Sequence, residues 1–142
     1  MLVLSNFMSS NSKRKHQIST RLEDYLEHIY ESIKENGIAT VSDIARRKKV
    51  KMPSVNSAVA KLTKTGYVTH DSYQTINLTP IGAKYCRNLD FKHRTVSAFL
   101  SEVLGVDRKI AEKDACIAEH YLHSKTIEKI VKYMQKLRIR KV

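Results

Sequence analysis

The stretch from Val41 to Val68 constrains the fold of this 142-residue chain more than any other. Its pattern predicts two short helices joined by a turn at Val50, with Ser42 placed to cap the first helix. Pro53 suits the start of the second helix, where its missing N–H has no intrahelical partner, and Gly66 suits the end. The second helix has one apolar face, made by residues at helical spacing: Val55, Val59 and Leu62. We therefore expect a helix-turn-helix.

The outward face of the second helix carries short hydrogen-bonding groups followed by long cations. These are Ser54, Asn56, Ser57, Lys61 and Lys64. A helix that lies in the major groove of DNA needs such a mixture, because small polar groups reach base edges and lysines reach phosphates. The neighbouring candidates for DNA contact are Arg46, Arg47, Lys51 and Pro53. The alternative reading of the same pattern is a solvated, basic helical hairpin.

A predicted β-hairpin follows directly. Residues 67–71 and 76–79 are short β-prone runs joined by a polar turn, and the turn offers Gln74 to DNA. Helix, turn, helix and hairpin are the order of a winged helix-turn-helix. The chain also carries 26 Lys and Arg against 14 Asp and Glu, a net charge of +12 that favours a polyanionic partner such as nucleic acid.

The composition argues against membrane and secreted classes. No apolar run approaches the roughly 20 residues of a spanning helix, and the N-terminus lacks the features of a signal peptide. Two cysteines do not make a disulfide framework. We expect a cytoplasmic protein with free thiols and no membrane partner.

The chain is expected to be mainly α-helical and to fall into three parts. Residues 1–18 are polar and predict a disordered N-terminal extension, and residues 19–79 predict the winged helix-turn-helix domain. Residues 80–142 predict a second, helical domain. Its first helix is expected to run from Pro80 to about Leu104.

Metal-ligand chemistry is densest near the C-terminus. Cys116, Glu119 and His120 lie at i, i+3 and i+4, so one face of a helix would present a thiolate, a carboxylate and an imidazole. This is a plausible half-site for a divalent metal; the alternative is an exposed Glu–His pair beside a buried cysteine. Asp24 and Glu27 share a face of the first predicted helix, although paired acids are usually only solvated.

His93 and Cys86 lie on the long helix but cannot hold one ion together. They are separated by two helical turns, roughly 10 Å along the axis. We interpret Cys86 as a packing residue. From spacing alone, His93 is more typical of a partly buried histidine than of a ligand.

Several segments, in order, resemble one family. They are LEDYLEHIYE, VSDIA, VKMPSV, INLTPIG, KHR, FLSEVLGVD and DACIAEHYLH. In this order and spacing the chain resembles the diphtheria toxin repressor and manganese transport regulator family of metal-dependent transcriptional repressors. The resemblance extends from about residue 19 to about residue 137.

The resemblance implies an N-terminal winged helix-turn-helix, with three helices and a two-stranded wing, joined by a long helix to an all-α dimerisation domain. It implies a homodimeric repressor of metal-uptake genes on pseudo-palindromic operator DNA, with no enzyme activity and no small-molecule substrate. The metal would be a corepressor that fixes the dimer in its operator-binding geometry. Carried over residue by residue, its ligands would be Asp24, Glu27, His93, Cys116, Glu119 and His120.

This implied ligand set combines two branches of the family. Asp24 is like the manganese branch, whereas the iron branch has methionine there; Cys116 is like the iron branch, whereas the manganese branch commonly has glutamate. We expect Mn²⁺ first and Fe²⁺ second, with Zn²⁺ or Co²⁺ able to bind in vitro. Ser97 stands where an ancillary metal site would need an acid, so we predict no such site. The family also usually has leucine where Lys48 stands.

Two readings from other classes stay open. A winged-helix regulator that needs no metal would use the same basic helix. A small metalloenzyme would use the same donors, but the sequence has no glycine-rich phosphate loop and no separate nucleophile or general base.

Overall fold

The computed structural model describes residues 18–71 and 75–140. Gln74 and almost all of the expected N-terminal extension lie outside the described residues. Ile18, the first described residue, is buried against the core of the N-terminal part.

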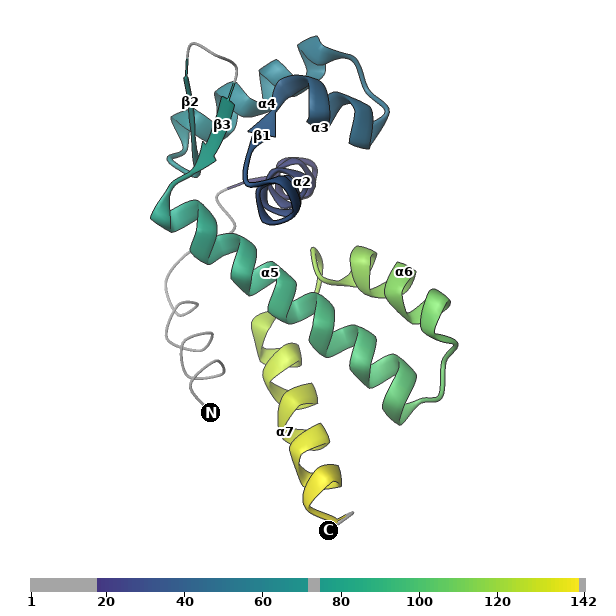
Figure 1. The fold of residues 1–142 in the computed structure, drawn as a ribbon. Coiled ribbons are helices and arrows are strands. Elements are labelled where there is room, and N and C mark those ends of the chain that lie inside the picture. The colour runs from purple at the N-terminus through teal and green to yellow at the C-terminus, as the bar shows by residue number, and fades with distance from the viewer. Residues whose placement is uncertain (1–17, 72–74, 141–142) are drawn as a thin grey trace. The chain divides into compact units, whose positions relative to one another are not determined.

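The described chain is mainly helical, as predicted, with one small sheet (Figure 1). Its elements are α2 (Thr20–Asn36), β1 (Ala39–Thr40), α3 (Val41–Lys48), α4 (Met52–Lys64), β2 (Val68–His70), β3 (Thr75–Leu78), α5 (Pro80–Ala98), a π-helical turn (Phe99–Val103), α6 (Arg108–Ala118) and α7 (Ser124–Arg140). The chain divides into two compact units between Arg87 and Asn88, inside α5. We call them the N-terminal unit and the C-terminal unit.

The N-terminal unit contains the predicted helix-turn-helix and wing. Strands β2 and β3 pair antiparallel and form the wing, with Val68 opposite Leu78. A third strand, β1, pairs with the other edge of β3, so the sheet order is β1-β3-β2. We did not predict β1, because two residues are too few to show an alternating pattern.

Helix α2 is the central element of this unit. It contacts α3, α4, β1 and β3 (Figure 1). Its apolar face is fully buried at Leu26 and Ile29. The buried face of α4 meets it with the stripe predicted from the sequence. That stripe is Val55, Val59 and Leu62, and Ala58 is buried beside it.

The start of α3 differs from our expectation. Ser42 was expected to cap it, but Thr40 is the N-cap and its Oγ1 accepts a hydrogen bond from the Asp43 amide at 3.2 Å. Ser42 lies within the first turn, with its hydroxyl 3.2 Å from that of Thr40. At the end of α4, Gly66 adopts the expected left-handed conformation, with φ +83°.

The C-terminal unit is entirely helical within the described residues. α5 ends at Ala98 and a π-helical turn continues to Val103, so the helical stretch ends near Leu104 as predicted, but its last turn is π-helical and not α-helical. The core of the unit is small and centres on Val96, Ala115 and Ile127. None of the helices in the described parts of the chain is long and apolar enough to cross a membrane.

Candidate metal centre and DNA-binding surface

The outward face of α4 is polar and basic, as the pattern predicted. Asn56, Ser57, Lys61 and Lys64 are exposed, and Ser54 is half-buried. Because the opposite face is fixed in the core, these side chains are held on one side of a rigid helix. Such a helix can offer hydrogen bonds to base edges and charges to phosphates.

The arginines of α3 already have acidic partners in the chain. Arg46 forms an ion pair with Asp43 in the same helix, and Arg47 pairs with Glu35 of α2 at 2.5 Å. The hydrogen bond that Arg47 donates to the Glu35 carboxylate raises the pKa of the guanidinium above its ordinary value. Lys51 is exposed at the N-terminus of α4 and makes no side-chain cap.

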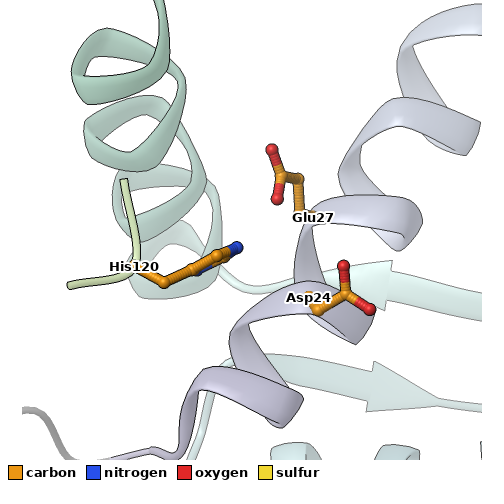
Figure 2. Close-up of side chains that lie close together, drawn as sticks. All are labelled: Asp24, Glu27 and His120. Atoms are coloured by element: carbon orange, nitrogen blue, oxygen red, sulfur yellow. The ribbon is translucent and has the colours of Figure 1, made fainter. Parts of the chain in front are cut away.

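Asp24 and Glu27 project from successive turns of α2, as Figure 2 shows. A carboxylate oxygen of one lies within 4.8 Å of a carboxylate oxygen of the other. Two negative charges this close repel each other unless a cation lies nearby. The pair is therefore suited to hold a positive ion.

In this structure, the Asp24 carboxylate forms an ion pair with a lysine of the same chain. The ammonium of Lys48, the last residue of α3, forms an ion pair with Oδ2 of Asp24. It also lies 4.4 Å from the ring centroid of Tyr25. His28 approaches the other carboxylate oxygen, with Nε2 3.7 Å from Oδ1.

In the C-terminal unit, His93 lies between two carboxylates. Its Nδ1 is 2.8 Å from Oε2 of Glu119, and its Nε2 is 2.8 Å from Oε2 of Glu112. When both acids are ionised, both ring nitrogens must carry protons to donate, so the ring is cationic. The hydrogen bond to Glu119, aided by the one to Glu112, raises the pKa of His93 to about 9 against the opposing effect of burial.

Glu112 is a member of this cluster that we did not predict. Its Oε1 accepts a hydrogen bond from the Ser97 hydroxyl at 2.5 Å. That bond, followed by the one from His93, lowers the pKa of the Glu112 carboxyl. The signal that would have found Glu112 is its position one helical turn before Cys116, on the same face of α6.

Glu119 is completely buried and only partly satisfied. One oxygen binds His93, but the other, Oε1, has no hydrogen-bond partner among the described residues. Nε2 of His120 lies 3.5 Å from that oxygen. Leaving a buried carboxylate oxygen unsatisfied is costly, and a metal ion ligated there would remove the cost. Glu119 and its neighbours therefore fit a divalent cation.

The three C-terminal donors do not form the single helical face that their spacing suggested. α6 ends at Ala118, so Glu119 is its C-cap and His120 lies in the following turn. Cys116 is exposed, and in the described residues its thiol does not gather with Glu119 and His120 within 4.8 Å. A thiolate ligand at Cys116 would need its side chain or the end of α6 to move.

Cys86 has the structural role that we expected. It is buried, and its thiol lies 3.7 Å from the carbonyl oxygen of Leu26. Burial, with the nearby charge of Glu27, raises the pKa of the Cys86 thiol to about 12. Such a thiol is a poor metal ligand and a poor nucleophile.

Two family models cover nearly all of the described chain. One, described as the iron dependent repressor N-terminal DNA binding domain, matches residues 17–76. The other, the iron dependent repressor metal binding and dimerisation domain, matches residues 79–140. The chain thus carries a DNA-binding domain and a dimerisation domain.

Curated relatives agree with these matches. An uncharacterized HTH-type transcriptional regulator of Methanocaldococcus jannaschii, MJ0568, is 37% identical over 123 residues, which cover 85% of this chain and 98% of the relative. The HTH-type transcriptional regulator MntR of Bacillus subtilis is 38% identical over 109 residues, which cover 77% of this chain and 76% of the relative.

Solved structures with this fold include the IdeR protein of T. acidophilum, with a TM-score of 0.71 and 26% identity over 85% of this chain. ScaR with bound Zn²⁺ has a TM-score of 0.71 and 28% identity over 80% of this chain. The chain spans 56% and 53% of these two structures, respectively. Similar proteins have thus been solved with a divalent metal bound.

Proposed function

Because the chain belongs to the diphtheria toxin repressor and manganese transport regulator family of metal-dependent DNA-binding transcriptional repressors, which are not enzymes, we propose that it represses metal-uptake genes in response to Mn²⁺. Fe²⁺ is the second choice of corepressor. The observation that carries the proposal is Oε1 of Glu119, a buried carboxylate oxygen without a hydrogen-bond partner among the described residues, beside the imidazole of His120. Because its partner is operator DNA, we place the protein in the cytoplasm.

The proposed ligands come from both units. They are Asp24 and Glu27 of α2, with His93, Cys116, Glu119 and His120 of the C-terminal unit. The donor types support this set, since carboxylates and imidazoles suit Mn²⁺ and Fe²⁺, and a thiolate suits Fe²⁺ and Zn²⁺. When bound, the ion supplies positive charge that offsets the acids. His93 must first give up a proton and release a carboxylate, so metal affinity should fall at acid pH.

The same ligand set explains how metal would control DNA binding. Ligands from both units make the arrangement of the units depend on metal occupancy. In a two-fold dimer, that arrangement sets the separation of the two recognition helices, which must match one DNA turn of roughly 34 Å on a pseudo-palindromic operator. By linkage, operator DNA must tighten metal binding by the same factor.

The proposed domains are residues 19–79 for DNA binding and 80–142 for metal binding and dimerisation. α4 is the proposed recognition helix, with Ser54, Asn56 and Ser57 facing base edges and Lys61 and Lys64 facing phosphates. The remaining proposed contacts are with the DNA backbone or the neighbouring groove. They are Arg46, Arg47, Lys51, Pro53 and Gln74.

The test is operator binding as a function of metal. Purified metal-free protein is titrated onto the DNA upstream of its own metal-transport genes, without oxygen, with Mn²⁺, Fe²⁺, Zn²⁺ or Co²⁺. We expect Mn²⁺ and then Fe²⁺ to give specific binding, while metal-free protein binds weakly and with strong salt dependence to any sequence. Zn²⁺ can bind the protein tightly without producing the active geometry, so DNA binding and not metal affinity identifies the corepressor.

The controls separate the alternatives. A shuffled operator of the same length reports the non-specific, charge-driven component. Operator binding that is the same with and without each metal would show that the protein is a metal-independent winged-helix regulator. Catalytic turnover that tracks metal content would instead support a metalloenzyme.

A further inference from the structure

The ion pair between Lys48 and Asp24 is placed where the proposed metal must bind. Both residues belong to the N-terminal unit, so the contact is set by the packing of α3 on α2. The pair joins the end of the first helix of the helix-turn-helix to a proposed metal ligand.

Burial sets this ion pair apart from a chance surface contact. The Lys48 side chain is 13% exposed, whereas that of Asp24 is 43% exposed. The lysine stem is covered and its ammonium is directed at two attractive groups, the Asp24 carboxylate and the face of the Tyr25 ring. A lysine whose side chain is mostly covered has fewer alternative positions than the exposed lysines of most surface pairs.

A metal ion and this ammonium cannot easily share Asp24. Lys48 occupies Oδ2, and His28 lies 3.7 Å from Oδ1. A divalent cation that ligated either oxygen would lie within a few ångströms of the ammonium, where like charges repel strongly in a partly desolvated site.

We propose that Lys48 is an internal competitor for the metal, so that ligation by Asp24 requires the Lys48 ammonium to leave that carboxylate. The inference rests on the proposed function, because it takes Asp24 to be a ligand. Lys48 thereby raises the metal concentration at which the site fills. It also links occupancy of the site to the helix-turn-helix, since the released charge belongs to α3, three residues before the cap of α4.

Charge-removing variants test the competition directly. Lys48→Met keeps an unbranched stem to cover Tyr25 but removes the ammonium. Mn²⁺ affinity is measured by equilibrium competition with a fluorescent chelator, using the full chain without DNA. We expect Lys48→Met to bind Mn²⁺ more tightly, by on the order of tenfold.

Lys34→Met is the matched control. Lys34 also lies on a tyrosine face, 5.1 Å from the Tyr30 ring centroid, and carries the same charge. It lies ten residues from Asp24 along α2, roughly 15 Å by helical rise. We expect its change in Mn²⁺ affinity to stay below about twofold, since the two sites share no partner.

A second background checks that the effect acts through Asp24. In Asp24→Asn, the carboxylate that Lys48 blocks is gone, so adding Lys48→Met should leave the residual affinity unchanged. An equal tightening in that background would show a general charge effect and overturn the proposal. Lys48→Gln is measured in parallel, because its shorter, neutral side chain provides a second test if methionine unfolds the turn.

The remaining outcomes are also decisive. If wild type responds to metal but Lys48→Met and Lys48→Gln bind Mn²⁺ as wild type does, or more weakly, Lys48 is not a competitor and the proposed function stands. If wild-type protein binds none of the tested metals, the proposed function fails and the competition fails with it.

Discussion

The two units neutralise their proposed ligand acids in different ways. In the N-terminal unit, half-exposed Asp24 is paired with the ammonium of Lys48, which balances the charge of the carboxylate but is not a proposed metal ligand. In the C-terminal unit, buried Glu119 faces His93, which is a cation here and is also a proposed ligand. Both acids are therefore balanced by the chain itself when no metal is bound.

The difference lies in how each cation can be removed. An ammonium leaves its carboxylate only by moving, whereas an imidazolium can also lose a proton and then present a lone pair to a metal. In the C-terminal unit, a metal ion could therefore replace the proton of His93 between the same carboxylates. On the competition proposed above, a metal ion could ligate Asp24 only after the Lys48 side chain had moved away, which would give the N-terminal unit its own barrier to metal binding.

The largest expected effect comes from removing the buried acid. Glu119→Gln keeps the shape of the side chain but removes the charge that balances both His93 and the proposed metal. We expect Mn²⁺ affinity to fall by at least about 100-fold, because even residues that only support a ligand often cost 10- to 100-fold. Chelator competition measures the loss, and Mn²⁺-stimulated operator binding should disappear with it.

Glu128→Gln is the control for that prediction. Glu128 is also a buried acid of the C-terminal unit, but its partners are Lys132 at 2.8 Å and Lys125 at 3.3 Å on α7. We expect this variant to keep Mn²⁺ affinity within about threefold of wild type, since it lies outside the ligand set. Equal losses in the two variants would mean that Glu119 acts through folding and not as a ligand.

Most of the fold could be predicted because its signals are local. The apolar stripe of α4 and the glycine at its end are properties of neighbouring residues, and both lie where the pattern put them. Features that depend on distant partners could not be predicted. β1 exists only because Ala39 pairs with Ile76, and the regular α5 stops at Ala98 without any proline or glycine to mark it.

The candidate site shows the same division. The donors Cys116, Glu119 and His120 were found by spacing, but their spacing assumed a helix that in fact ends at Ala118. The ion pairs of this site were not predicted, since no sequence pattern links Lys48 to Asp24 or Glu112 to His93 across so many residues. Long-range partners of this kind are set by packing and were visible only in the fold.

The next largest effect is on the pH dependence of stability, and it tests whether His93 is held as a cation. The pKa of His93 is raised to about 9, above the ordinary histidine value, by Glu119 and Glu112. A histidine whose pKa is higher in the folded than in the unfolded state stabilises the fold when it is protonated. This contribution is complete below the unfolded-state pKa near 6.5 and is lost as the pH rises through the folded-state pKa of about 9. We expect metal-free protein to lose about 2 kcal/mol of unfolding free energy over this window from His93, given the screening of half-exposed Glu112.

Urea unfolding of metal-free wild type and His93→Gln measures this contribution. The advantage of wild type over the variant should be larger near about pH 6 than near about pH 9.5, with unchanged m-values. Glutamine retains a hydrogen-bond donor but cannot titrate, so the difference between the two curves reports the imidazolium. A difference that stays constant with pH would show that His93 is not held as a cation between these carboxylates.

The smallest expected effect tests whether the exposed thiol completes the C-terminal donors. Cys116 is exposed, and among the described residues its thiol does not form one cluster within 4.8 Å together with Glu119 and His120, so joint ligation by the three requires a local movement. Cys116→Glu would replace a soft donor by a hard one with a longer reach, which favours Mn²⁺ over Zn²⁺. We expect the ratio of half-maximal Mn²⁺ to half-maximal Zn²⁺ for operator binding to fall by on the order of tenfold.

Ile117→Glu adds the same charge at the next exposed position and should leave that ratio unchanged. If Cys116→Glu also leaves it unchanged, the thiol is not a ligand. The metal would then be held by carboxylates and imidazoles alone. Asp24 and Glu27, with Lys48 competing for Asp24, would then contribute more to the preference for one metal ion over another.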